Sequence, residues 1–435
     1  MTTNIPNLID RSLFKQILAH IQEKEMTVII GPRQVGKTTL LEQIKEYVLD
    51  NRKVNSKNLF YFNLDVTRDL SLFSSQQNVI NFIKDRKNKQ KIIYLLIDEV
   101  QRIKNAGIFL KGIYDLKLGV KFILTGSSSL EIKSKIQEAL TGRKKIFKLL
   151  PLSFVEYANF QNPANFQIIQ RSKTISNYDF AEWEKLINDF ALFGGYPRIV
   201  IEQDINKKIE LLEEIYNSYL EKDIINFLKI KNPISFTQLV SLLAAQAGGL
   251  LNINTLSRNT SLDIKTLNHY LAVLENTFII KLIKPFFSNP KKELVKMPKI
   301  YFLDNGLRNF ALSRFKNLSD RADDKGPVWE NLVASELLKI IKPPHSLHYW
   351  RSLQKAEVDF IIRKGNGQII PIEAKAQKMI KPIISRSLRS FLNKYKPKTG
   401  FLINFNLKNK QKINKTDLYT VTLDHFALSK NLLGA

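Results

Sequence analysis

A short segment near the N-terminus combines glycines, a lysine and hydroxyl side chains at a spacing that can bind phosphate. The segment is Gly31-Pro32-Arg33-Gln34-Val35-Gly36-Lys37-Thr38-Thr39, which satisfies the pattern G-x-x-x-x-G-K-[ST]. The glycines let the backbone curl so that N–H groups surround a β-phosphate, while Lys37 reaches the β and γ oxygens and Thr38 ligates Mg²⁺. An apolar run at 28–30 precedes the segment and a helical stretch at 39–48 follows it, as the pattern requires. The segment therefore predicts a site for ATP and Mg²⁺.

The second half of such a site needs carboxylates at the end of a strand. The apolar run 93–97 ends in Asp98 and Glu99. Asp98 would hold the magnesium shell, and Glu99 would polarise the attacking water as a general base. A third strand-like run is followed by Thr125 and Ser127, whose hydroxyls are expected to sense the γ-phosphate. Because all three parts come in chain order, the sequence predicts ATP hydrolysis.

A second group of charged residues lies near the C-terminus. Asp359 and Glu373 fall on adjoining strand-like runs, and a helix expected to start at 326 carries Glu330. Lys375 shares a strand face with Glu373 because the two are two residues apart. The pattern resembles the PD-(D/E)XK nuclease core, in which Asp359, Glu373 and Glu330 would bind one or two Mg²⁺ and Lys375 would orient the attacking water. Since such domains can lose cleavage and keep binding, both an active and an inactive domain stay open.

Positive charge is concentrated beside this second group. The chain has 67 lysines and arginines against 40 acids, a net charge of +27, which attracts polyanions such as nucleic acid. An AT-rich coding sequence, which favours lysine and asparagine, is a second explanation of the overall charge. Between Ala374 and Thr416, however, there is no aspartate or glutamate, so every charged residue is basic. These are Lys375, Lys378, Lys381, Arg386, Arg389, Lys394, Lys396, Lys398, Lys408, Lys410, Lys412 and Lys415.

The elements that must position these groups divide the 435-residue chain into four segments. Residues 1–150 alternate short apolar runs with helical stretches, which predicts an α/β domain with a parallel sheet. Residues 151–232 are helical and are interpreted as a lid, and residues 326–435 as a second, restriction-endonuclease-like α/β domain. The chain has no cysteine, so disulfides, thiolate zinc sites and cysteine nucleophiles are excluded.

The remaining segment, residues 233–320, predicts a winged helix. Three short helical stretches come before two strand-like runs, the order of a helix-turn-helix followed by a wing. Lys265 and His269 on the third helix could face DNA, and Lys291 and Lys292 fall at the expected wing tip. A module of this kind can equally serve as a packing or partner-binding unit.

Nearly the whole chain resembles the prokaryotic AAA-type ATPases that carry a C-terminal nuclease-like domain of unknown function. The motifs behind the resemblance are Thr141-Gly142-Arg143, Pro151-Leu152-Ser153-Phe154 and Gly194-Gly195-Tyr196-Pro197. The resemblance implies that Arg143 stabilises charge on the transferring phosphoryl group, from its own subunit or from a neighbouring one in a homo-oligomer. Typical members have asparagine after the third strand, where this chain has Thr125 and Ser127, so turnover is expected to be slow.

Together these features predict a cytoplasmic, Mg²⁺-dependent ATPase whose nucleotide state controls binding of nucleic acid, with DNA favoured over RNA, and cleavage of it where the nuclease-like domain is active. The alternative is a nucleotide switch that acts on a protein partner in signalling or defence, with an inactive nuclease-like domain. Salt dependence distinguishes the two, because phosphate contacts weaken steeply as salt rises. No membrane partner is expected, since no apolar run approaches the roughly 18 residues that a span needs.

Overall fold

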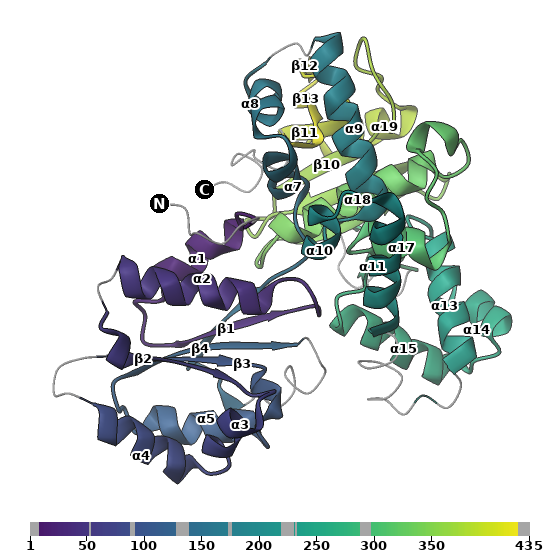
Figure 1. The fold of residues 1–435 in the computed structure, drawn as a ribbon. Helices are drawn as coiled ribbons and strands as arrows, with labels where there is room; N and C mark the ends of the chain where they lie inside the picture. The colour runs from purple at the N-terminus through teal and green to yellow at the C-terminus, as the bar shows by residue number, and fades with distance from the viewer. Residues whose placement is uncertain are drawn as a thin grey trace. The chain divides into compact units, whose positions relative to one another are not determined.

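The computed structural model describes residues 8–51, 54–87, 92–127, 139–172, 176–218, 230, 233–287 and 297–424. The chain divides into two compact units (Figure 1). One contains residues 1–150 and 276–278, and the other contains residues 151–275 and 279–435. The first unit is built on a parallel sheet and the second carries a mixed sheet, which confirms the predicted α/β fold class.

The described part of the first unit contains a sheet of five parallel strands in the order β2-β3-β4-β1-β5. The strands are β1 (Met26–Gly31), β2 (Leu59–Asn63), β3 (Ile93–Asp98), β4 (Val120–Ser127) and β5 (Lys144–Lys148). Every residue of β1 and β3 is buried, as expected for central strands that helices cover on both faces. The carboxyl ends of β1, β3 and β4 consequently lie at one edge of the sheet.

Helices cover both faces of this sheet. They are α1 (Ser12–His20), α2 (Lys37–Asp50), α3 (Thr67–Leu72), α4 (Gln76–Arg86) and α5 (Ala106–Asp115). In Figure 1, α1 and α2 lie on one face, and α3, α4 and α5 lie on the other. Ile17, Leu41 and Ile44 pack with Ile29 and Leu96 in a fully buried core on the α1–α2 side. This apolar contact fixes the start of α2, and therefore the phosphate-binding segment, against the sheet.

The second unit begins with helices and a small hairpin. The helices are α7 (Phe154–Gln161), α8 (Pro163–Arg171), α9 (Asn177–Phe193), α10 (Pro197–Ile201), α11 (Ile205–Asn217), α13 (Pro233–Ala245), α14 (Ile253–Thr260) and α15 (Ile264–Asn276). Strands β6 (Ile280–Ile283) and β7 (Lys299–Phe302) then pair antiparallel. Three helices followed by a hairpin is the predicted element order, while the winged-helix assignment itself stays a prediction. Lys291 and Lys292 lie outside the described residues.

Two of the motifs behind the family resemblance meet in this unit. The Leu152 N–H donates to the Gly195 carbonyl at 2.7 Å, and a Cβ at Gly195 would lie 2.4 Å from the Leu152 carbonyl oxygen. Ser153 begins α7 with a capping box that it shares with Glu156. The Gly195 N–H donates to the buried Asp304 carboxylate at 2.8 Å. These motifs therefore join helix ends at a place where only a glycine backbone fits.

The C-terminal part of the second unit is a mixed sheet in the order β12-β13-β11-β10-β9-β8. The strands are β8 (Ser346–Arg351), β9 (Glu357–Arg363), β10 (Ile369–Ala374), β11 (Thr399–Asn404), β12 (Asn409–Ile413) and β13 (Thr416–Thr422), and the helices are α17 (Asn305–Ala311), α18 (Lys325–Ile340) and α19 (Arg386–Tyr395). The apolar side of α19, with Leu388 and Phe391, packs on Val358 of β9. Helix α18 contacts β7 and β10, so it lies between the hairpin and the sheet.

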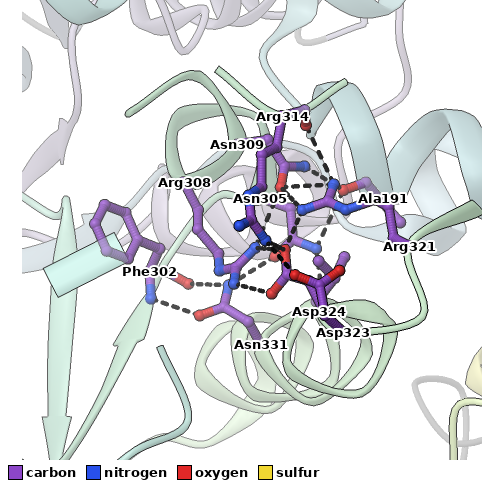
Figure 2. Close-up of polar contacts among 11 residues, drawn as sticks. Ala191, Phe302, Asn305, Arg308, Asn309, Arg314, Arg321, Asp323, Asp324 and Asn331 are labelled. Carbon is purple, nitrogen blue, oxygen red and sulfur yellow. Dashed lines mark hydrogen bonds and ion pairs between the residues drawn. The ribbon is translucent and has the colours of Figure 1, made fainter. Parts of the chain in front are cut away.

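A buried polar cluster holds α9, α17 and the start of α18 together (Figure 2). Arg308 is fully buried and donates to the two carboxylate oxygens of Asp324 at 3.2 and 2.6 Å. Arg321 contacts the same carboxylate and donates to Asn309 Oδ1 at 3.2 Å. Asn309 in turn donates to the Ala191 carbonyl of α9 at 2.9 Å. Removing Asp324 would leave two buried guanidinium groups without their counter-charge, which is strongly destabilising.

Asn331, in the second turn of α18, holds the end of β7 (Figure 2). Its Oδ1 accepts from the Phe302 N–H at 2.8 Å, and its Nδ2 donates to the Phe302 carbonyl at 3.1 Å. The same Nδ2 donates to Asn305 Oδ1 at 2.6 Å. Asn331 has no exposed surface, so water cannot replace these hydrogen bonds. The amide therefore sets the position of α18 along β7.

We expect Asn331→Ala to lower the free energy of unfolding by about 3 kcal/mol, because the buried groups on Phe302 and Asn305 would lose their partner. Urea denaturation followed by tryptophan fluorescence measures this change. Asn254→Ala is the matched control, since Asn254 is an exposed residue of α14 and its loss should alter stability by less than about 0.5 kcal/mol. Equal losses in the two variants would contradict the role given to Asn331.

Candidate functional site

The phosphate-binding segment connects the end of β1 to the start of α2. Gly36 has φ 93° and Gln34 has φ 57°, so the chain curls through the left-handed region twice before the helix begins at Lys37. Gly31 is required for a different reason, because a Cβ there would lie 2.0 Å from the Leu149 carbonyl oxygen. The two glycines of the pattern thus serve a close approach and a turn, which leaves the N-terminus of α2 facing the loop.

Lys37, which belongs to the segment, and Arg11, which precedes α1, both hydrogen-bond to carbonyls of the segment. The Lys37 Nζ donates to the carbonyls of Gly31 at 3.2 Å and Pro32 at 2.7 Å, so the ammonium is held at the loop. The Arg11 guanidinium donates to the Val35 carbonyl at 3.1 Å. Sequence reasoning missed Arg11, which precedes the first helix and gives no motif signal. Its contact joins the segment before α1 to the phosphate-binding loop.

The carboxylate of Asp98 is the centre of the candidate nucleotide site. It is 2% exposed and lies at the end of β3, which β4 separates from β1 in the sheet. Its Oδ2 accepts from Thr38 Oγ1 at 2.7 Å and from Tyr61 Oη at 3.4 Å. Its Oδ1 accepts from Thr125 Oγ1 and from the Glu99 N–H, the latter at 3.1 Å. The structure therefore brings together Thr38 and Asp98, the two residues expected to share a magnesium ion.

Tyr61 and Thr125 surround Asp98 from the neighbouring strands. Burial and the Asp98 carboxylate raise the pKa of Tyr61 well above its ordinary value, so the phenol stays a donor. Thr125 is fully buried, and its hydroxyl donates a hydrogen bond to Asp98. The sequence had led us to expect this hydroxyl at a γ-phosphate. Ser127 ends β4 and pairs in register with Gly31, which places the end of β4 beside the phosphate-binding segment. Tyr61, an aromatic residue in an ordinary strand pattern, was not foreseen.

Glu99 follows directly in a strained conformation. Its φ of 57° lies in the left-handed region, which non-glycine residues rarely adopt and which is common at functional sites. Its Oε2 accepts from the Gln101 side-chain amide. The strain turns the chain from β3 into the short helix at Val100–Arg102. Glu99 is thereby held at the same sheet edge as the phosphate-binding segment, as the sequence predicted.

The oxygen donors at this edge fit magnesium. Thr38 Oγ1 and Asp98 Oδ2 come from the loop and from a strand end and already lie within hydrogen-bond distance. A hydroxyl and a carboxylate are hard oxygen ligands, and Mg²⁺ takes few protein ligands together with phosphate oxygens and water. Bound there, the ion would neutralise charge on the β- and γ-phosphates.

Arg143 lies at the opposite edge of the sheet. It directly precedes β5, and its carbonyl accepts from the N–H of Met26, the first residue of β1. The phosphate-binding segment follows the last residue of β1, roughly 16 Å along the strand. The Arg143 guanidinium makes two contacts with the Asp115 carboxylate, at 2.6 and 3.0 Å, and this hydrogen bonding lowers the pKa of Asp115. Within one chain the structure does not bring Arg143 to the nucleotide site.

In the second unit, Asp359 and Glu373 do meet. The register pairs Ile372 of β10 with Phe360 of β9, so Glu373 and Asp359 stand opposite each other on one face. Burial, and next the Glu330 carboxylate, raise the pKa of Asp359 to about 8. The Ala374 N–H donates to Asp359 Oδ2 at 2.8 Å and favours its charged form. The predicted convergence of the two strands is therefore present.

The other two predicted members of this site are engaged in ion pairs. The Lys375 ammonium lies 2.6 Å from Glu373 Oε1, and Ser385 donates to Glu373 Oε2 at 3.1 Å. Glu330 Oε1 accepts from Lys299 Nζ at 3.0 Å and from Tyr301 Oη at 2.6 Å. Lys299 also lies 2.5 Å from Glu357 Oε1. Sequence reasoning missed Lys299, Tyr301 and Glu357.

This donor set does not fit a magnesium cage as it stands. Glu330, predicted to complete the cage, has its Oε1 occupied by an ammonium and a phenol. Among the residues that the structure describes, no group of three acids or histidines is placed to hold a metal ion. The metal-binding role of Glu330 stays a prediction, and in the structure its carboxylate is paired with a buried lysine. We refer to Lys299, Glu330, Glu357 and Asp359 as the lysine-centred cluster.

The basic residues between Ala374 and Thr416 include some that form ion pairs and others that are exposed on α19 and just after it. Among those in ion pairs, Lys410 contacts Asp417 at 3.2 Å and Lys378 contacts Glu184 at 3.0 Å. Helix α19 instead carries exposed charges opposite its buried side. The exposed basic residues on α19 and just after it are Arg386, Arg389, Lys394, Lys396 and Lys398. Because Ser385 begins α19 and contacts Glu373, this basic face begins beside the carboxylates.

Family comparisons cover most of the chain. Residues 23–158 match the profile of an AAA domain, and the first unit is accordingly a P-loop domain of the AAA type. Residues 184–319 match a domain of unknown function, DUF8612, and residues 325–423 match another, DUF4143. Among the described residues, no helix is long and apolar enough to cross a membrane.

Two curated relatives are similar along most of their length. A protein of Methanocaldococcus jannaschii is 29% identical over 357 residues, which are 80% of this chain and 74% of the relative. A protein of Haemophilus influenzae is 27% identical over 367 residues, which are 82% of this chain and 85% of the relative. Both are described as uncharacterized.

Two solved structures share distant similarity. The ORC1 protein of Aeropyrum pernix, determined in complex with DNA, is 11% identical with a TM-score of 0.32, over 70% of this chain and 92% of that one. PCH-2 of C. elegans is 14% identical with a TM-score of 0.32, over 49% of this chain and 64% of that one.

Proposed function

We propose that the protein is a Mg²⁺-dependent ATPase whose nucleotide state controls binding of nucleic acid by the second unit. The observation that carries the ATPase part is the hydrogen bond between Thr38 and Asp98, which joins the phosphate-binding segment to the end of β3. Lys37 holds the loop and would bind the β and γ oxygens, while Glu99 at the same edge would orient the attacking water. The AAA-domain match over residues 23–158 supports this proposal.

Nucleic acid is the partner that the charge of the second unit favours. The exposed basic residues of α19 form one face of a helix without an acid among them, and such a face neutralises a phosphate backbone. DNA is favoured over RNA because the three helices and hairpin of residues 233–302 follow the order of a DNA-binding winged helix. Cleavage forms no part of the proposal, since Glu330, Glu357 and Glu373 are each paired with a lysine.

Arg143 is proposed to act on the nucleotide of a neighbouring copy. Its position at the amino end of β1 and β5 separates it from the phosphate-binding segment of its own chain. Asp115 holds the guanidinium at the surface, where 31% of the Arg143 side chain is exposed. An arginine presented in this way suits contact between subunits, in which it would stabilise the charge of the transferring phosphoryl group. A homo-oligomer follows from this assignment.

We expect Lys37→Ala to abolish ATP turnover and Glu99→Gln to retain ATP binding while blocking hydrolysis. The first change removes the cation at the β and γ oxygens, and the second keeps shape but removes the base. Turnover is measured by phosphate release and binding with a fluorescent ATP analogue. Lys15→Ala serves as control because Lys15 is an exposed residue of α1. Wild-type turnover in either site variant would overturn the site assignment.

Mixing two inactive variants tests the role of Arg143. Arg143→Ala and Lys37→Ala should each be inactive alone, because each lacks one half of a shared site. In a random mixture roughly a quarter of the interfaces pair an intact Lys37 with an intact Arg143, so turnover should reappear. Lys145→Ala, at the exposed neighbouring position, should keep full turnover. Failure of the mixture to recover any activity would contradict action between subunits.

Removing two charges from α19 should weaken nucleic-acid binding and its salt dependence. We expect Arg386→Ala with Arg389→Ala to reduce the slope of log affinity against log salt by about 2. Fluorescence anisotropy with single-stranded DNA, duplex DNA and RNA at several salt concentrations gives the slope. Lys84→Ala with Lys111→Ala removes the same charge from exposed positions of α4 and α5 and should leave the slope unchanged.

The same titrations separate the proposal from its alternative. ATP turnover that rises with nucleic acid in a salt-sensitive way would support control by nucleic acid. No binding to any of the three substrates at low salt would contradict it and favour the nucleotide switch that acts on a protein partner.

A further inference from the structure

Lys299 contacts Glu330, one of the acids to which the nuclease-like pattern assigns a metal ion. Its side chain is 3% exposed, and its ammonium contacts Glu330 at 3.0 Å and Glu357 at 2.5 Å. These carboxylates come from α18 and β9, while Lys299 comes from β7. One ammonium on β7 thus gathers carboxylate oxygens from two other elements, as a bound cation does.

The electrostatics of the cluster keep the lysine charged. Burial opposes a charge on Lys299, but Glu330, Glu357 and Asp359 together raise the pKa of the ammonium above its ordinary value. Arg351 adds a second cation at 3.2 Å from Glu357 Oε2. Each of the two Glu357 oxygens therefore has a protein counter-charge. A divalent ion would have to displace a buried ammonium from its hydrogen bonds in order to enter.

Several contacts fix the lysine in place. Tyr301, two residues along β7, is fully buried and donates to the same Glu330 oxygen at 2.6 Å. Asn331, next to Glu330, binds the backbone of Phe302 at the end of β7. Separation of Lys299 from Glu330 would therefore also disturb the hydrogen bonds that Tyr301 and Asn331 make between α18 and β7.

We propose that Lys299 is the resident cation of the lysine-centred cluster. The ion pairs of Lys299 then join the β6–β7 hairpin to α18 and the C-terminal sheet, and the cluster holds no divalent metal. The inference deepens the proposed function, because a second unit without a metal site binds its partner and does not cut it. Lys299 is a positioning residue, and its effect is on structure and on metal affinity.

Metal binding by the full-length protein tests this directly. The experiment uses nucleotide-free protein carrying Asp98→Asn, which disables the metal site of the first unit, and follows free Mn²⁺ by electron paramagnetic resonance. We expect no binding tighter than about 1 mM, and no change of Tm on adding Mn²⁺. Tighter binding that is lost when Asp359→Asn is added would overturn the proposal.

Charge-matched variants test the ion pair itself. Lys299→Met should lower Tm by roughly 10 °C, because it leaves buried carboxylates without their cation. Adding Glu330→Gln to Lys299→Met should recover a large part of that loss, since one uncompensated charge is removed. Lys281→Met on the neighbouring strand β6, where Lys281 is half exposed and pairs with Glu275, is the control and should change Tm little.

The outcomes are separable from those of the proposed function. A Tm of Lys299→Met equal to that of the control would overturn the resident-cation role, whatever the ATPase assays show. Conversely, loss of nucleic-acid binding in the α19 variant, or its absence in the wild-type protein, concerns the proposed function alone, because neither ATP nor nucleic acid is present in the Mn²⁺ and Tm measurements.

Discussion

Parallel pairing of β1, β3 and β4 is the constraint on which the nucleotide site depends. Because the three strands run the same way in register, whatever follows each of them arrives at one edge of the sheet. The phosphate-binding segment, Asp98 with Glu99, and the end of β4 therefore converge although they are far apart in sequence. The buried carboxylate of Asp98 then joins them, since its two oxygens accept hydrogen bonds from residues on four successive stretches of the fold.

The same constraint explains why Arg143 is placed elsewhere. A residue that precedes a parallel strand lies at the amino edge of the sheet, and β5 pairs with β1 along its whole length. A sequence motif that comes after Asp98 in the chain can therefore be distant from it in the fold. The separation bears on the choice that the sequence left open, because Arg143 at the amino edge lies away from the phosphate-binding segment of its own chain. Its action across a subunit boundary is therefore the form that we propose.

Apolar runs and short motifs predict most of this architecture, but long-range contacts escape them. The strands β1, β3 and β9 are recognisable in the sequence because their apolar residues form runs. The edge strands β5 (Lys144–Lys148) and β12 (Asn409–Ile413) are rich in lysine and lack such a run. Arg11 and Lys299 were missed for a different reason. Each acts on a residue more than 20 positions away, and a basic side chain in a basic sequence carries no signal of its partner.

Acidic residues have opposite surroundings at two places in the protein, around Asp98 in the first unit and around Lys299 in the second. Asp98 faces neutral donors, hydroxyls and an N–H, that can turn toward a phosphate or a water, so a divalent cation can take their place at modest cost. Glu330 and Glu357 face an ammonium that is itself buried. A carboxylate cluster therefore indicates a metal site only when no protein cation has reached it first. The charge that pairs with Glu330 and Glu357 comes from β7 and not from the strands that carry the motif.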